Sequence, residues 1–157
     1  DTLKHGQGTE TWPNGYIYEG EFFNSKWQGQ GTLNFPDGAT YVGEWRDGEK
    51  YGRGTGVSSI SMKRTTETGD FVSTIERYVG EFLNGLPHGD GVYHYANGDK
   101  YIGTWQHGEV VAGQGNIISK ETQKLVADIK KLNDVVNNQR DQFSASILKP
   151  EEAYKVY

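Results

Sequence analysis

Aromatic, polar and glycine residues alternate in a five-residue unit that recurs four times along the chain. Residues 41–45 read Tyr-Val-Gly-Glu-Trp, and the other copies begin at Tyr18, Tyr78 and Tyr101. A period of two predicts a β-strand whose tyrosine, glycine and final aromatic residue share one face. The first two copies start 23 residues apart, as do the last two, whereas the middle gap is 37 residues. A fixed period of this size indicates a repeat array.

Each unit continues into a turn and a second strand that carries two glycines. Gly48 follows the unit at 41–45, and Gly52 and Gly54 follow two residues apart. Glycine weakens a strand, so we expect both glycines to lie on the ring-bearing face and leave room for a flat aromatic ring. The second strands end in Asp37-Gly38 or Asn97-Gly98, and such pairs favour the type I′ hairpin turn. The sequence therefore predicts a series of antiparallel hairpins.

The middle gap contains an insertion of 14 residues. Its flanks are rich in β-branched and hydroxyl residues, and 66–70 has the composition of a turn. We interpret the insertion as a protruding hairpin with about seven residues in each strand. The alternative is a disordered loop, but Ile60, Met62, Phe71 and Ile75 are more apolar than a typical linker.

The combined pattern resembles the MORN (membrane occupation and recognition nexus) repeat. It consists of Tyr-x-Gly-x-Trp/Phe, a glycine three residues later, Gly-x-Gly, and Asp/Asn-Gly, and it covers residues 4–115. The resemblance implies an all-β fold, a single-layer antiparallel meander of MORN β-hairpins. We expect a repeat array over 1–117 and a C-terminal helix and tail over 118–157. Within the array we expect a half-repeat at 1–17 and repeats at 18–40, 41–77 (with the insertion), 78–100 and 101–117.

The C-terminal part has a helical pattern, and glycine is absent from it after Gly115. One stripe repeats in steps of four and three: Leu125, Ile129, Leu132, Val136, Gln139 and Phe143. Ser119 is the expected N-cap, and the helix should end near Ser146. We favour a helix that folds back near Tyr101 and Trp105, in a monomer. The alternative is a helix-mediated dimer held by a coiled coil.

Composition and charge argue against several classes of function. The chain has no cysteine, which excludes disulfides and cysteine nucleophiles, and no apolar run approaches the roughly 20 residues of a membrane span. Residues 1–115 hold 9 Lys/Arg and 15 Asp/Glu, an acidic balance that argues against nucleic acid and anionic lipid. His5 and His88 occupy a repeat position held elsewhere by Gln28 and Tyr51, which argues against a metal or catalytic role. We expect no enzyme activity, cofactor or metal.

The aromatic residues of the recurring unit are the candidate binding residues. We expect their main role to be packing on neighbouring glycines, but a single-layer sheet would also let them line an exposed groove. The resemblance implies that partner segments dock in that groove, so the candidate partner-binding residues are Tyr18, Phe22, Tyr41, Trp45, Tyr78, Phe82, Tyr101 and Trp105. The opposite face carries a row formed by Glu21, Glu44 and Glu81. We interpret this row as a solvated surface, with a docking site for a basic helix as the alternative.

The resemblance implies a non-catalytic scaffold that holds a segment of a partner protein. The alternative is a regulatory or targeting module of a larger enzyme, because similar repeats accompany lipid-kinase and protein-methyltransferase domains. Direct lipid binding is suggested by the family's name and disfavoured by the acidic charge. The expected location is cytoplasmic, including the periphery of a membrane or of the cytoskeleton. No residue in the sequence identifies the partner.

Overall fold

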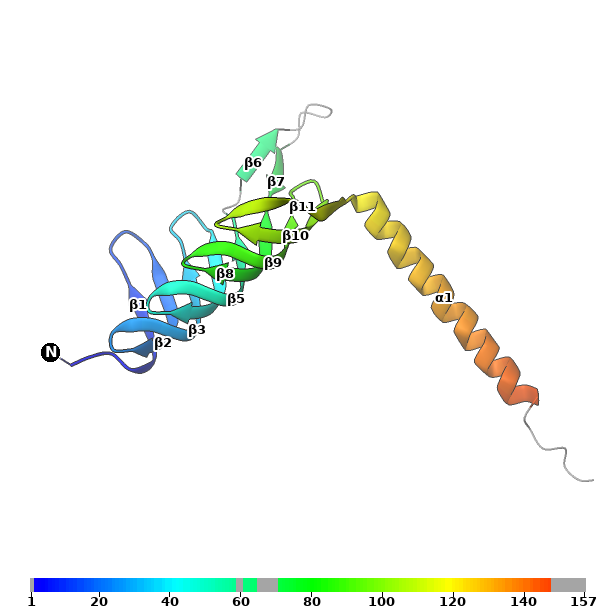
Figure 1. Cartoon of the computed structure of the whole chain (residues 1–157), viewed down its shortest axis with the longest axis horizontal. Helices are drawn as coiled ribbons and strands as arrows, with labels where there is room; N and C mark the ends of the chain where they lie inside the picture. Colours follow the sequence, from blue (N-terminus) through cyan, green and yellow to red (C-terminus); the bar gives the residue numbers. More distant parts are fainter. Residues whose placement is uncertain (1, 59–60, 65–70, 148–157) are drawn as a thin grey trace, which may run out of the picture. The chain divides into compact units, whose positions relative to one another are not determined.

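The computed structural model describes residues 2–58, 61–64 and 71–147 (Figure 1). The chain forms two compact units, Asp1–Ser119 and Lys120–Tyr157. The first unit contains all the strands of the described residues, and the second contains the helix.

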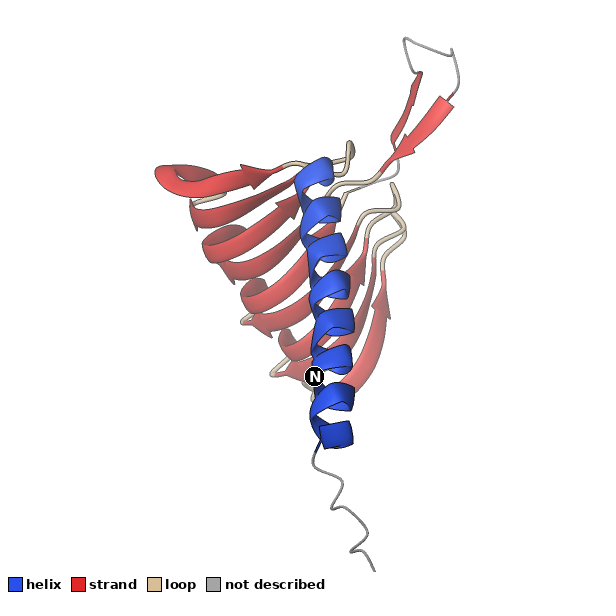
Figure 2. Cartoon of the chain, turned by 90° about the vertical axis from the view of Figure 1, so that its right-hand side faces the viewer, coloured by secondary structure: helices blue, strands red, loops and turns tan. Residues whose placement is uncertain are grey.

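Nine of the strands in the described residues form one open antiparallel sheet, curved in a single layer (Figure 2). Their spatial order is β1-β2-β3-β4-β5-β8-β9-β10-β11, which is a meander. Their bounds are β1 Gly6–Thr11, β2 Ile17–Phe23, β3 Lys26–Asn34, β4 Thr40–Arg46, β5 Glu49–Val57, β8 Arg77–Leu83, β9 Leu86–His94, β10 Lys100–Gln106 and β11 Glu109–Ile118. The all-β fold class and the meander of hairpins are confirmed.

The type I′ turns are not at the predicted pairs. They lie in the turns at the other ends of the strands. The two central residues have positive φ at Asn24-Ser25, Asp47-Gly48, Asn84-Gly85 and His107-Gly108. In the predicted pairs Asp37-Gly38 and Asn97-Gly98, only the glycine has positive φ. The Asp37 carboxylate accepts a hydrogen bond from Ala39 N at 3.0 Å, which holds the aspartate in a tight side-chain turn. The predicted type I′ turn at these two pairs is therefore wrong.

The insertion forms a separate two-stranded sheet, which confirms the predicted hairpin. Its strands are β6 (Ser61–Arg64) and β7 (Phe71–Thr74), and they pair antiparallel. Within the described residues each strand has four residues, where about seven were predicted. At the base of the hairpin, Ser58 N donates to Glu76 O at 2.9 Å and Glu76 N donates to Ser58 Oγ at 3.0 Å. The predicted turn at 66–70 lies outside the described residues.

A row of directly opposed glycines crosses all nine strands of the main sheet. Its members are Gly8, Gly20, Gly31, Gly43, Gly54, Gly80, Gly91, Gly103 and Gly115. The recurring tyrosines lie flat over this row, so that a Cβ built on Gly54 would lie 2.6 Å from Cε2 of Tyr41. The glycines therefore provide the space that the buried rings occupy.

The second unit contains one helix, α1 (Lys120–Ile147). It begins directly after Ser119 and ends one residue beyond Ser146, close to the predicted bounds. Its apolar stripe is exposed, with fractions from 49% for Ile129 to 67% for Phe143. Folding back and coiled-coil pairing both stay predictions. No helix in the described residues is long and apolar enough to cross a membrane.

Candidate binding surface

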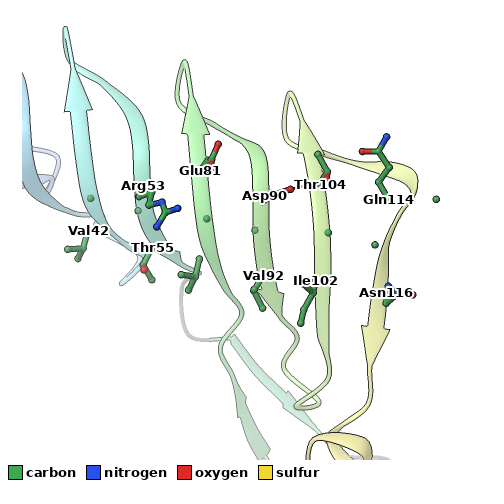
Figure 3. Close-up of a pocket in the computed structure, with 18 of the residues that line it drawn as sticks. Val42, Arg53, Thr55, Glu81, Asp90, Val92, Ile102, Thr104, Gln114 and Asn116 are labelled. Carbon is green, nitrogen blue, oxygen red and sulfur yellow. Dashed lines mark hydrogen bonds between the residues drawn. The ribbon is translucent and has the colours of Figure 1, made fainter.

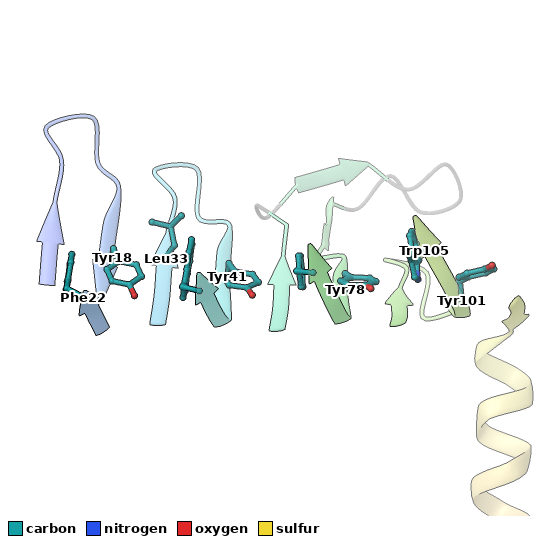
Figure 4. Close-up of a cluster of buried hydrophobic side chains, with 9 residues drawn as sticks. Tyr18, Phe22, Leu33, Tyr41, Tyr78, Tyr101 and Trp105 are labelled. Carbon is teal, nitrogen blue, oxygen red and sulfur yellow. The ribbon is translucent and has the colours of Figure 1, made fainter. Parts of the chain in front are cut away.

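The eight candidate binding residues all lie in the buried core. Tyr18 and Tyr41 are 0% exposed, and Tyr101 and Trp105 are the most exposed of the eight at 8% each. Leu33, which sequence reasoning missed, joins them at 5% (Figure 4). We call the side of the sheet that carries these residues the ring face. The expectation that these rings also line an exposed groove is wrong, because almost none of their surface reaches solvent. Their direct binding of a partner stays a prediction.

Edge-to-face ring contacts connect each repeat to the next. Tyr18 meets Trp45 with ring centroids 5.4 Å apart, and Tyr41 meets Phe82 at 4.9 Å. The same contact joins Tyr78 and Trp105 at 5.2 Å. Six partly buried aromatic residues pack against this core, namely Trp12, Tyr16, Trp27, Phe35, Tyr93 and Tyr95. Their packing and the flat tyrosines explain why the ring face has a core without a second layer.

Each of three core tyrosines also donates a hydrogen bond to the backbone of its own strand, three residues further along. The hydroxyls of Tyr18, Tyr41 and Tyr78 donate to the carbonyl oxygens of Glu21, Glu44 and Glu81 at 3.0, 3.1 and 3.1 Å. Burial, followed by the nearby Glu21 carboxylate, raises the pKa of Tyr18 to about 12. Burial and then Glu81 likewise raise the pKa of Tyr78 to about 12. These hydroxyls therefore remain protonated donors at neutral pH.

The glutamates of the row formed by Glu21, Glu44 and Glu81 lie where the strand register shifts, and two of them bind backbone amides there. The register shifts at Gly20/Glu21 and again between Gly43 and Trp45. There the Glu21 carboxylate accepts a hydrogen bond from Gln30 N at 3.1 Å, and Glu44 accepts one from Arg53 N at 3.0 Å. The interpretation of these side chains as merely solvated therefore needs correction, because at least two of them bind backbone amides.

The two glycines of each Gly-x-Gly pair have different roles. The second, such as Gly54, lies under a tyrosine ring as predicted. The first has positive φ, 63° at Gly29 and 58° at Gly52, and a Cβ there would run into the glutamate carboxylate on the opposite face. The prediction that both glycines share the ring-bearing face is therefore wrong, because the register shift turns the first glycine over.

An open groove of about 1040 Å³ lies on the face opposite the rings, which we call the groove face (Figure 3). Its lining comes from β3 to β11, so it extends over most of the sheet. Directly opposed residues on five neighbouring strands form what we call the β-branched row: Val42, Thr55, Val79, Val92 and Ile102. Figure 3 shows this row beside a second, polar row with Arg53, Glu81, Asp90 and Thr104.

The β-branched row presents apolar surface to solvent. Val42 is 50% exposed, Ile102 44% and Val79 37%. Sequence reasoning missed this row, although a signal was present. The residue between the tyrosine and the glycine of the recurring unit is Glu19 in the first copy but Val42, Val79 and Ile102 in the others. Exposed apolar residues gathered in a groove, with charges beside them, are typical of a surface that binds another molecule.

A third row lies on the groove face, two residues along the strands from the β-branched row and outside the groove lining. We call it the rim of the groove, and it changes character from one end of the sheet to the other. On β3, β4 and β5 it consists of Asn34, Thr40 and Val57. On β8, β9 and β10 it consists of Arg77, His94 and Lys100. Burial, and then the charges of Arg77 and Lys100, lower the pKa of His94. The groove is therefore neutral along one part of its rim and cationic along the other.

The side chains that line the groove offer apolar and charged contacts. Its lining has no cysteine, serine or histidine. No group of three or more His, Cys, Asp or Glu side chains within residues 2–58, 61–64 and 71–147 could hold a metal ion. Val42, Val79 and Ile102 can exclude water from an apolar side chain, while Arg53 and Asp90 can select charged neighbours.

Comparison with protein families matches the chain to the MORN repeat. The matched segments are residues 1–15, 18–40, 41–55 and 78–100. They contain the half-repeat, two complete units and the first part of the unit that carries the insertion. The hairpin β10–β11 lies outside the matched segments, although Gly103 and Gly115 continue the glycine row. A search of curated proteins found no match. The presence of these repeats is consistent with an interaction or targeting module.

Proposed function

Because the chain belongs to the MORN-repeat family, we propose that it is a non-catalytic scaffold whose groove face holds a segment of a partner protein. The observation that carries the proposal is the exposed apolar surface of Val42, Val79 and Ile102 inside a groove of about 1040 Å³. Burying such surface is worth about 25 cal/mol per Å², so an apolar segment gains free energy by entering the groove.

The proposal uses a different face from the one that the sequence pattern favoured. The rings of Tyr41 and Trp45 are already buried by their own repeats, so a partner would have to displace the core to reach them. The β-branched row needs no such rearrangement, because its side chains already lie open to solvent. The rings then act indirectly, by holding the curvature that forms the groove.

Selection of peptides from a displayed random library on the immobilised full-length chain tests this function. A Val42→Asp/Val79→Asp variant places two charges in the β-branched row and should lower the affinity of selected peptides at least about tenfold, because burying each valine side chain against a peptide is worth about a kilocalorie or more. Leu86→Asp is the matched control, since Leu86 is 46% exposed but lies outside the groove lining. Selected peptides that bind the Val42/Val79 variant and the parent equally would contradict the proposal.

A further inference from the structure

Three cationic or titratable side chains meet on the rim of the groove. Arg77 on β8, His94 on β9 and Lys100 on β10 occupy directly opposed positions. They share the groove face with Val79, Val92 and Ile102, because each lies two residues along its strand from a member of the β-branched row. The Arg77 Nη2 and His94 Nε2 atoms are 3.3 Å apart. We call these three residues the basic triplet.

The basic triplet carries positive charge, although the repeat region as a whole is acidic. Among the described residues, no ion pair involves Arg77 or Lys100. The nearby Glu76 carboxylate accepts a hydrogen bond from Tyr93 Oη at 2.6 Å and points to the other face of the sheet. His94 is therefore flanked on both neighbouring strands by cations.

We propose that the basic triplet binds carboxylate side chains of an acidic peptide segment lying in the groove. The inference rests on the proposed function, and it adds the charge of the partner and its orientation. A guanidinium and an ammonium group next to an imidazole offer several charge-assisted donors to a carboxylate. The apolar side chains of the same segment then lie on Val79, Val92 and Ile102.

The polar row on the other side of the β-branched row determines which way the segment lies. Glu81 and Asp90 are on the same strands as Arg77 and His94, but on the far side of the β-branched row. An acidic edge of the segment is attracted to the triplet and repelled by these two carboxylates, which outnumber the single cation, Arg53, in the same row. A membrane fits this site poorly, because anionic headgroups would face Glu81 and Asp90, and a flat bilayer cannot follow a concave groove.

Two displayed libraries of random peptides test the inference on the full-length chain. The libraries are identical except that Asn and Gln replace Asp and Glu in the second. The parent chain should enrich acidic residues from the first library and yield few binders from the second. Arg77→Gln/Lys100→Gln should lose that enrichment and bind the selected peptides at least about tenfold more weakly, since two charge-assisted hydrogen bonds are removed.

Lys26→Gln/Arg46→Gln is the matched control for net charge. It removes two positive charges that lie outside both the groove lining and the basic triplet, so it should keep the enrichment and most of the affinity. Equal selection from both libraries by the parent chain would overturn the inference and leave the proposed function standing. A complete absence of binders from both libraries would overturn both the inference and the proposed function.

The titration of His94 gives a second readout that needs no substitution. A bound carboxylate favours the charged imidazolium, so the pKa of His94 should rise when an acidic selected peptide is added, as followed by NMR of the ring. The affinity should therefore increase as the pH falls from about 8 to about 6, and the gain reaches about tenfold for each unit of pKa change only below the pKa of the free chain. An unchanged His94 titration in the saturated complex would contradict the inference.

Discussion

The two faces of the nine-stranded sheet are built from the same strands but follow different rules. On the ring face, every repeat uses a tyrosine, a glycine and a second aromatic residue at the same positions, and the tyrosines and second aromatics are at most 8% exposed. On the groove face, the residue between tyrosine and glycine changes from Glu19 to Val42, Val79 and Ile102, and half of Val42 is exposed. The positions that repeat hold the fold, whereas the positions that vary are free to select a partner.

The difference follows from how tightly each face is packed. A tyrosine ring that lies flat on two glycines leaves no space for another side chain, so every repeat must supply the same residues. A side chain on the groove face meets solvent, and its identity changes the free energy of folding little.

Truncation of a ring should have the largest effect on stability. Trp45 is 3% exposed, contacts the rings of Tyr18 and Tyr41, and donates from Nε1 to Gly31 O at 3.1 Å. Trp45→Ala should lower the free energy of unfolding by roughly 3–5 kcal/mol in chemical denaturation. Phe23→Ala is the matched control, because Phe23 is 58% exposed, and it should lose less than about 1 kcal/mol. Similar losses in the free energy of unfolding for both variants would contradict the expectation that the ring face is packed more tightly than the groove face.

A side chain added on the glycine row should have the next largest effect. A Cβ at Gly91 would lie 2.5 Å from Cε2 of Tyr78, so Gly91→Val should destabilise the protein by about 1–3 kcal/mol. At Gly56 the nearest atom is Phe82 Cζ at 3.8 Å, so Gly56→Val should be neutral or stabilising, since valine favours strands. Thermal unfolding of the two variants measures this difference in stability. A Gly91→Val melting temperature at or above the parent's would show that the ring does not need the glycine.

Loss of a glutamate that binds the backbone should have a smaller effect. Glu44→Ala leaves Arg53 N without the acceptor now 3.0 Å away and should cost about 1 kcal/mol, because the site is partly exposed. Glu44→Gln keeps an acceptor oxygen and should recover part of that loss. Glu19→Ala, on the same face of the sheet and without such a contact, should be nearly neutral. Equal effects of Glu19→Ala and Glu44→Ala would indicate that both carboxylates are simply solvated.

The sequence predicted the ring face far better than the groove face. Period-two alternation and the 23-residue repeat are sufficient to predict the meander and its hairpins. They also predict the burial of residues such as Tyr18 and Trp45. The register shifts were not predictable, because they depend on Glu44 reaching a backbone amide of the neighbouring strand. The basic triplet depends on alignment across three strands from residues at positions 77, 94 and 100, and a single repeat does not contain that information.

The smallest expected effect concerns His94 on the groove face. Burial, and then Arg77 and Lys100, lower its pKa below the ordinary value of 6.5 in the folded chain. Below pH 6.5 the unfolded chain therefore takes up a proton before the folded chain does. The stability due to neutral His94 is present above that pH and is lost as the pH falls through the lowered folded pKa.

His94→Gln removes this proton uptake, so the variant should gain stability relative to the parent between about pH 7 and about pH 5. His107→Gln, which removes a histidine outside the basic triplet, controls for the loss of an imidazole in general. Urea denaturation at both pH values measures the difference, which should be smaller than that for Trp45→Ala, Gly91→Val or Glu44→Ala, because His94 is only partly buried. A pH-independent difference between His94→Gln and the parent would mean that neither burial nor the charges of Arg77 and Lys100 lower the pKa of His94, and the rim would then be only a solvated edge.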